Sequence, residues 1–224
     1  MVSTVIIILT CVIAVYGHEC KEFKLSAADQ SVIDMMKHYL HTSRKTECSD
    51  NKLNGGAVYV RWGKKSCPEG AHLVYSGQAG GNDHLNKGGG SNYLCLPNDP
   101  DNGKPYSYAN DALYGAEYEL NGNRRPSGFG NFHDQDVPCA VCRRKATSYV
   151  LMIPGKQTCY SGWKAEYTGF LMTEYIGHNN NKDYVCVDKD AEPIDSDSSN
   201  KNGALLYVVR TTCGRPCAAG NCGV

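Results

Sequence analysis

The stretch Gly63-Lys64-Lys65-Ser66-Cys67-Pro68-Glu69-Gly70 occurs a second time, as Gly155-Lys156-Gln157-Thr158-Cys159-Tyr160-Ser161-Gly162. Each copy is followed, at the same distance from its cysteine, by a Tyr-[Ser/Thr]-Gly triplet, Tyr75-Ser76-Gly77 and Tyr167-Thr168-Gly169. A shared period of about 90 residues is too long for a solenoid repeat and is typical of the duplication of a small subdomain.

Cysteines continue the correspondence between the two halves. A second cysteine follows each triplet, Cys95 in the first half and Cys186 in the second. Each half then closes with two cysteines a few residues apart, Cys139 with Cys142 and Cys213 with Cys217. This regularity indicates that the cysteines belong to the framework of the fold.

Short runs of β-branched and aromatic residues, bounded by Gly, Asn and Pro, predict strands after residue 48. The expected strands span residues 57–62, 71–75, 92–96, 114–120, 149–153, 163–172, 184–187 and 204–209. The sequence therefore predicts a mostly β fold with two tandem, pseudo-repeated, disulfide-stapled β subdomains, residues 55–145 and 146–217, and a C-terminal tail over 218–224.

Residues 1–17 have the pattern of a signal peptide. Their apolar core is too short to span a bilayer, and Gly17 offers a small residue for cleavage. No second apolar run follows, so we expect a secreted protein without a membrane span. Cleavage removes Cys11 from the 12 cysteines of the chain. In an oxidising compartment the remaining cysteines are expected to form disulfides, and their odd number leaves at least one thiol free or linked to another chain.

The N-terminal segment, residues 18–54, is predicted to contain an amphipathic helix over 26–42. Ser26 and Asp29 have the spacing of a capping box, and apolar residues follow at helical intervals. Cys20 and Cys48 flank this helix. Two interpretations stay open: the helix packs on its own domain with Cys20 and Cys48 joined, or it mediates oligomerisation and these cysteines link chains.

Charge gives no sign of a nucleic-acid or anionic-membrane partner, because 23 basic residues balance 23 acidic ones. Acidic turns after strands contain four candidate calcium ligands, Asp99, Asp101, Asp188 and Asp190. None matches an EF-hand loop, and solvated loops are the simpler interpretation. No other cofactor is expected.

Catalytic patterns are weak in this sequence. His133 with Asp134 and Asp136 could supply acid–base chemistry, but their spacing does not establish a geometry. The Cys139-Ala140-Val141-Cys142 spacing occurs in redox motifs, yet it follows Pro138 in a β-rich chain, which favours structural disulfides. We therefore expect a protein that is not an enzyme.

Several of these motifs together resemble a known domain, the C-terminal globular domain of the short-chain collagen-like proteins of sponges, cnidarians and molluscs. The resemblance covers about residues 55–217 and is carried by Tyr59-Val60-Arg61-Trp62-Gly63, Cys67-Pro68-Glu69-Gly70, Tyr75-Ser76-Gly77, Asn92-Tyr93-Leu94-Cys95-Leu96-Pro97, Asp136-Val137-Pro138-Cys139-Ala140-Val141-Cys142 and Lys201-Asn202-Gly203-Ala204-Leu205-Leu206-Tyr207. A more distant likeness is to the terminal non-collagenous domain of basement-membrane collagen, which is a duplicated, β-rich, trimer-forming domain. The chain departs from these families because it has no Gly-X-Y run and so cannot form a collagen triple helix.

The resemblance to the distant relatives implies a nested pairing of the cysteines. Carried over, the expected bonds are Cys67–Cys142, Cys95–Cys139, Cys159–Cys217 and Cys186–Cys213. Spacing alone leaves the alternative of Cys67–Cys95 and Cys159–Cys186 open. With the nested pairing, Cys222 becomes the expected free or interchain thiol.

Two functions follow as expectations. The first is a secreted, disulfide-rich structural or matrix-associated protein that self-associates, for example as a trimer, and contacts extracellular matrix components or glycans. The alternative is an extracellular recognition module, lectin-like or immune-type, with calcium as a candidate cofactor.

Overall fold

The computed structural model describes residues 26–27, 29–36, 55–101, 112–210 and 221–224. The chain divides into two compact units, residues 1–52 and 53–224, and the sheet belongs entirely to the second. The predicted signal peptide lies outside the described residues, as do Cys20 and Cys48.

In the first unit, residues 27 and 29–36 are helical. The Ser26 backbone N–H donates to Oδ2 of Asp29 over 3.1 Å, and the Asp29 backbone N–H donates to Oγ of Ser26 over 3.1 Å. This reciprocal pair satisfies two of the N–H groups that the start of a helix leaves without partners. The predicted helix start is thus confirmed, and the part of the prediction beyond residue 36 falls outside the described residues.

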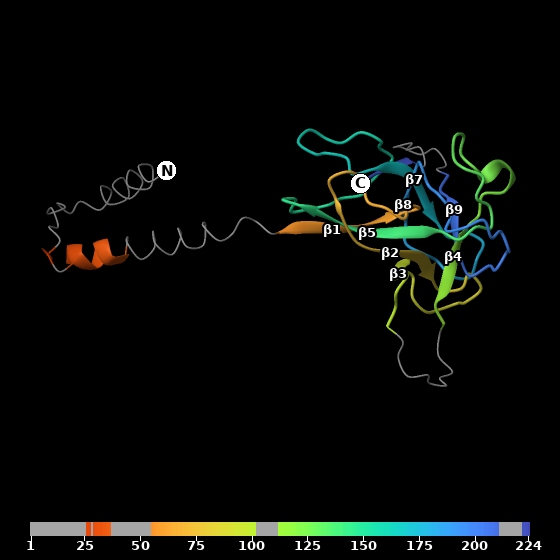
Figure 1. The fold of residues 1–224 in the computed structure, drawn as a ribbon, viewed down its shortest axis with the longest axis horizontal. Coiled ribbons are helices and arrows are strands. Elements are labelled where there is room, and N and C mark those ends of the chain that lie inside the picture. The colour runs from red at the N-terminus through yellow and green to blue at the C-terminus, as the bar shows by residue number, and fades with distance from the viewer. Residues whose placement is uncertain (1–25, 28, 37–54, 102–111, 211–220) are drawn as a thin grey trace, which may run out of the picture. The chain divides into compact units, whose positions relative to one another are not determined.

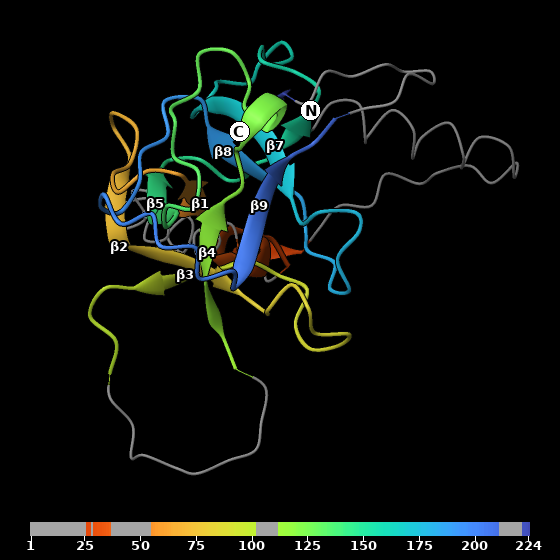
Figure 2. The ribbon, with the colours of Figure 1, turned by 90° about the vertical axis from the view of Figure 1, so that its right-hand side faces the viewer.

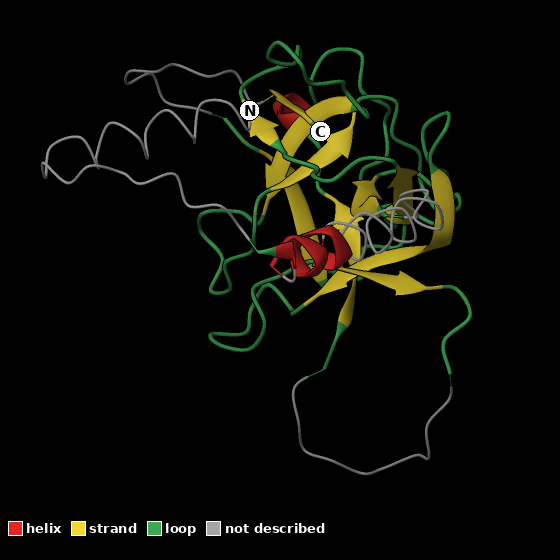
Figure 3. Cartoon of the chain, turned by 90° about the vertical axis from the view of Figure 1, so that its left-hand side faces the viewer, coloured by secondary structure: helices red, strands yellow, loops and turns green. Residues whose placement is uncertain are grey.

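The second unit consists mainly of strands and loops (Figure 3). The strands of its described part are β1 (Gly56–Trp62), β2 (His72–Gly81), β3 (Leu94–Pro97), β4 (Tyr114–Tyr118), β5 (Pro138–Lys145), β6 (Ile153–Pro154), β7 (Thr168–Thr173), β8 (Val185–Asp188), β9 (Ala204–Val208) and β10 (Asn221–Gly223). A short 3-10 turn, η1 (Gly122–Arg124), follows β4. The mostly β fold expected from the sequence is confirmed.

Seven of these strands close on themselves (Figures 1 and 2). Their order is β7-β8-β1-β5-β2-β4-β9, and β9 pairs with β7 to complete the ring. β3 pairs with β2 outside this ring, and β10 pairs with β7 and with β6. Most pairings are antiparallel, whereas β1–β8 and β4–β9 are parallel.

The pairings of the first five strands have counterparts among the last five. β2 pairs with β3, β4 and β5, and β7 pairs with β8, β9 and β10. β1 pairs with β5, as β6 pairs with β10. All of these pairings are antiparallel.

The recurring sequence motifs have the same local geometry in both halves. The Tyr75 hydroxyl donates to the carbonyl oxygen of Cys95 over 3.0 Å, and the Tyr167 hydroxyl donates to that of Cys186 over 2.9 Å. The glycines that open and close the Cys67 stretch, Gly63 and Gly70, have φ values of 83° and 78°, and Gly155 and Gly162 have 76° and 85°. These are left-handed conformations, in which glycine lacks the steric penalty of a side chain.

Two apolar clusters form the core of this unit. One contains large side chains from β4, β7, β8 and β9 and from the loop after β4, including Tyr118, Phe129 and Met172. The other surrounds the Cys142 and Cys222 sulfurs and contains Tyr59 and Tyr167. β5 is buried continuously from Pro138 to Cys142, which indicates that both of its faces are covered.

Several strand expectations need correction. β7 begins at Thr168, so residues 163–167 of the expected strand 163–172 are not a strand, and β2 continues to Gly81 beyond the expected residue 75. Residues 149–152 are not a strand, and only Ile153–Pro154 pairs at that place. The expected C-terminal tail contributes β10, since residues 221–223 pair with both β6 and β7. β5 was not expected as a strand, although it lies between β1 and β2 in the sheet.

Gly77 offers a test of the packing of β3 on β2. A Cβ atom at residue 77 would overlap the carbonyl oxygen of Leu96, which is backbone and cannot move aside cheaply. We expect Gly77→Ala to lower the free energy of unfolding by about 3 kcal/mol, as overpacked cores do, measured by urea denaturation. The control is Gly88→Ala, where an added Cβ would have no atom within 4 Å. Equal stability of the two variants would contradict this account.

Candidate functional site

Three disulfides join described residues of the second unit. Cys67, after β1, is bonded to Cys142 on β5, and Cys95 on β3 is bonded to Cys139, also on β5. These are the two nested bonds that the family resemblance implies for the first half, and they exclude the alternative bond Cys67–Cys95. The third bond joins Cys186 on β8 to Cys222 on β10.

The third bond contradicts two expectations. Cys186 was expected to pair with Cys213, and Cys222 was expected to be the free or interchain thiol. The physical reason is the pairing of β10 with β7: Cys222 lies opposite Gly169, as Cys139 lies opposite Gly77. Cys159 is bonded to none of the described residues, and its expected partner Cys217 lies outside them, as does Cys213.

The four candidate calcium ligands do not meet within the described part of the chain. The Asp188 carboxylate is buried and accepts hydrogen bonds from the Arg61 guanidinium and the Asp190 backbone N–H, both at 2.8 Å. Asp190 is paired with Lys189, and Asp99 and Asp101 are exposed. One group of three metal-ligating side chains does come together among the described residues: Glu119, His133 and Asp134.

The described residues form a groove of about 460 Å³. It lies between the segment that follows β5, the loop before β7 and residues 223–224. Tyr149 is 78% exposed and Trp163 is 47% exposed at this groove, and Leu151 is exposed as well. Lys156 and Lys164 add positive charge to its lining. Aromatic surface next to cationic groups is a feature of recognition sites for proteins and for acidic ligands.

A charged cluster forms one wall of the groove. The Arg144 guanidinium donates to both carboxylate oxygens of Glu166, over 2.8 and 2.7 Å, and the Tyr59 hydroxyl donates to the same carboxylate over 2.5 Å. Burial alone would raise the pKa of the Glu166 carboxyl, but the hydrogen bonds from Arg144 and Tyr59 outweigh it and hold the pKa below its usual range. Near neutral pH, these hydrogen bonds therefore hold the side chains of Arg144, Glu166 and Tyr59 in one arrangement.

A second polar network is buried within the loop between β7 and β8. The Lys182 amine is fully buried, donates to Oδ1 of Asn180 over 2.7 Å and lies 3.5 Å from the Glu174 carboxylate. Glu174 also interacts with Nδ1 of His178 over 2.8 Å. Asn180 donates to the carbonyl of Gly88, so the network ties this loop to the glycine-rich loop after β2. These partners satisfy one another, which indicates a structural role.

The acid–base arrangement considered from the sequence forms only in part. His133 Nδ1 lies 3.2 Å from Asp134, but Asp136 is paired with Lys201 instead. Glu119, for which sequence spacing gave no signal, lies 3.6 Å from Nδ1 of His133. The Cys139–Cys142 pair is not a dithiol, because each cysteine is bonded elsewhere.

A scan of the chain against protein-family models finds no match. Among the helices that the structure describes, none has the length and apolar character needed to cross a membrane.

The Glu166 cluster makes stability depend on pH. Because the folded-state pKa of Glu166 is lowered, its contribution is fully present above the ordinary value of 4.5 and is lost as the pH falls through the folded-state value. We expect Glu166→Gln to lower the free energy of unfolding by about 2 kcal/mol near neutral pH. The difference from wild type should shrink toward about pH 3, measured by urea denaturation at each pH. Glu69→Gln, at an exposed glutamate, is the control, and a difference independent of pH would contradict the assignment.

Proposed function

We propose that this protein is a secreted, non-enzymatic structural component of an extracellular matrix that self-associates through its disulfide-stapled β domain. The three disulfides carry this proposal. Their cysteines at positions 139, 142, 186 and 222 are buried in the core. Disulfides of this kind form and persist in oxidising compartments.

We also propose that the second unit is related to the C-terminal domain of short-chain collagen-like proteins and arose by duplication. The nested bonds of the first half agree with the pairing that the resemblance implies. The recurring strand pairings and the matching hydrogen bonds of Tyr75 and Tyr167 support a duplication. Without a Gly-X-Y run, association has to come from the globular domain or from the N-terminal segment.

The groove is the surface that favours association with a second copy. Tyr149, Leu151 and Trp163 expose apolar surface there, and β6, the last strand of the sheet order, lies beside it with one edge not paired among the described strands. Exposed apolar surface next to an open sheet edge is a common docking site for another chain. The formal net charge of zero adds no long-range repulsion between copies.

The same groove also favours the alternative function, an extracellular recognition module, because its lining contains cationic and aromatic side chains. Lys156 and Lys164 line it together with Trp163, whereas the charge of Arg144 is paired with Glu166. Positive charge beside an indole ring suits an acidic sugar or peptide. In this case the occupant of the groove is a ligand, and the protein need not self-associate.

Native mass measurement distinguishes these two functions. We expect the mature chain to form a trimer or other multimer at micromolar concentration, and the variant Tyr149→Ser with Trp163→Ser to shift toward the monomer, measured by analytical ultracentrifugation with and without reductant. Ile176→Ser is the matched control, because Ile176 is 96% exposed and lies outside the groove lining.

Wild-type protein that remains monomeric would contradict self-association. Binding of acidic glycans or peptides by that monomer, lost in the double variant, would support the recognition module. A multimer that disappears only on reduction would instead assign association to interchain cysteines.

A further inference from the structure

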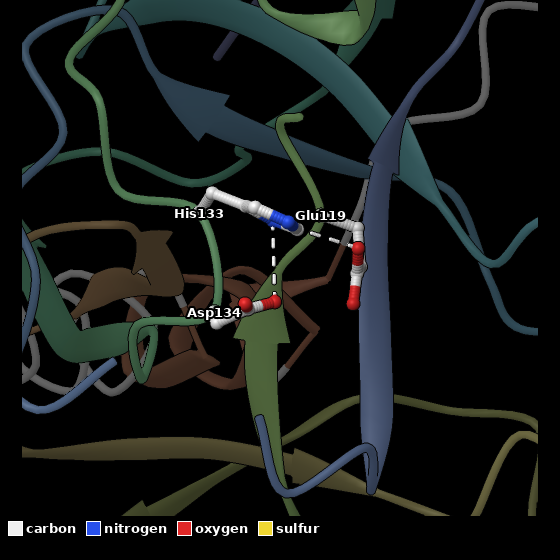
Figure 4. Close-up of side chains that lie close together, drawn as sticks. All are labelled: Glu119, His133 and Asp134. Atoms are coloured by element: carbon white, nitrogen blue, oxygen red, sulfur yellow. Dashed lines mark ion pairs between the residues drawn. The ribbon is translucent and has the colours of Figure 1, made fainter. Parts of the chain in front are cut away.

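Glu119, His133 and Asp134 are brought together by main-chain hydrogen bonds at the end of β4. The Asp134 N–H donates to the Tyr118 carbonyl over 2.9 Å, and the Tyr118 N–H donates to the Gln135 carbonyl over 3.0 Å. The Glu119 N–H donates to Leu206 on β9 over 3.0 Å. The loop that leaves β4 therefore returns to its own starting point, and Figure 4 shows the three side chains pointing toward one another there.

The distances between their ligand atoms fit a common metal ion. Nδ1 of His133 lies 3.6 Å from Oε2 of Glu119 and 3.2 Å from Oδ1 of Asp134. All three ligand atoms lie within 4.8 Å of one another. Two ligand atoms bound at about 2.1 Å to a tetrahedral zinc ion are separated by roughly 3.4 Å, so the spacing suits one shared ion.

Two polar atoms of this cluster, Nδ1 of His133 and Oδ1 of Asp134, are buried without a hydrogen-bond partner among the described residues. The Glu119 side chain beside them is 7% exposed, and its carboxylate lies 3.6 Å from the His133 ring. A buried carboxylate that lacks such partners is costly unless a positive charge compensates it.

The other buried acidic side chains of the described residues show that this cost is normally avoided. Glu117 accepts hydrogen bonds from the backbone N–H groups of Lys201 and Asn202, and Asp188 accepts from Arg61. The Glu174 carboxylate interacts with the His178 ring and forms an ion pair with the Lys182 amine. The Glu119 carboxylate instead lies 3.6 Å from the His133 ring and close to a second carboxylate, that of Asp134. Arg124 also acts on Glu119 electrostatically, but its guanidinium lies over the rings of Tyr175 and Tyr207.

We propose that Glu119, His133 and Asp134 bind a zinc ion. One imidazole nitrogen with two carboxylates suits zinc, whereas calcium and magnesium prefer oxygen ligands alone. His133 and Asp134 are partly exposed, which gives the ion a path from solvent and leaves a position for water. The bound ion would fasten the loop between β4 and residue 134 and thereby stabilise the edge where β4 pairs with β9.

Titration of the full-length, oxidised protein with zinc chloride tests the proposal. We expect one zinc ion per chain in isothermal calorimetry and a higher melting temperature in its presence. Glu119→Gln and His133→Gln should each weaken zinc binding at least tenfold. His72→Gln, at an exposed histidine, and Cys159→Ser, at a cysteine without a described partner, should bind zinc as the wild type does.

The stability of each variant without zinc shows whether a loss of zinc binding comes from a lost ligand or from misfolding. Glu119→Gln removes a buried charge, so without zinc it should be at least as stable as the wild type while gaining nothing from added zinc. Cobalt substitution should give the visible absorption of a nitrogen- and oxygen-ligated ion, and this band should be absent from Glu119→Gln. The proposal would be overturned if the wild type failed to bind zinc or if Glu119→Gln bound it fully. It would also be overturned if Glu119→Gln were less stable than the wild type without zinc, because the Glu119 carboxylate would then already be compensated in the zinc-free protein.

Discussion

The first half of the sheet depends on β5 being held on both of its faces by disulfides. Cys139 and Cys142 are three residues apart in a regular strand, so their side chains point to opposite faces. Cys139 is bonded to Cys95 on β3, Cys142 is bonded to Cys67 in the segment after β1, and both Cys139 and Cys142 are buried. A Cys-x-x-Cys spacing on a helix would bring two thiols together, whereas on this strand it separates them and lets each staple a different layer.

The second half uses a related arrangement with its last strand. Cys222 on β10 joins β8 as Cys139 on β5 joins β3, and each of these cysteines lies opposite the glycine of a Tyr-[Ser/Thr]-Gly triplet. At Gly77 and Gly169 an added side chain would overlap the backbone of the neighbouring strand. The triplet is therefore the place where two strands cross closely, with the tyrosine hydroxyl bonded to the strand that carries the second cysteine.

Local patterns in the sequence predict the helix cap and the β class, because these depend on neighbouring residues. β5 gives no such pattern: it begins with proline and is buried on both faces, so apolar and polar residues do not alternate along its first half. β10 has only three residues, and its partners lie more than fifty residues earlier in the sequence. The Glu119 cluster could be predicted only in part: the sequence pointed to His133 with Asp134, but not to Glu119, because the return of this loop to β4 is set by hydrogen bonds of Tyr118 and not by residue spacing. Asp188 was one of four candidate calcium ligands, with a solvated loop as the simpler interpretation; sequence alone cannot show that Arg61 reaches it and that it is buried.

Buried carboxylates hold the loops of this domain onto its strands. Glu117 on β4 binds the backbone at 201–202, just before β9, and Glu174 after β7 binds residues in the loop that precedes β8. Asp188 at the end of β8 binds Arg61 on β1 where these parallel strands meet. At Glu117 and Glu174, one charge near a strand end orders a loop that has little apolar surface of its own, since loops rich in Gly and Asn cannot be held by packing alone. The loop after β4 places Glu119 in the same position relative to its strand, but it supplies a histidine and an aspartate where the other loops supply N–H donors. The zinc ion proposed for this cluster would be the counterpart of the N–H groups and cations that complete the other three sites.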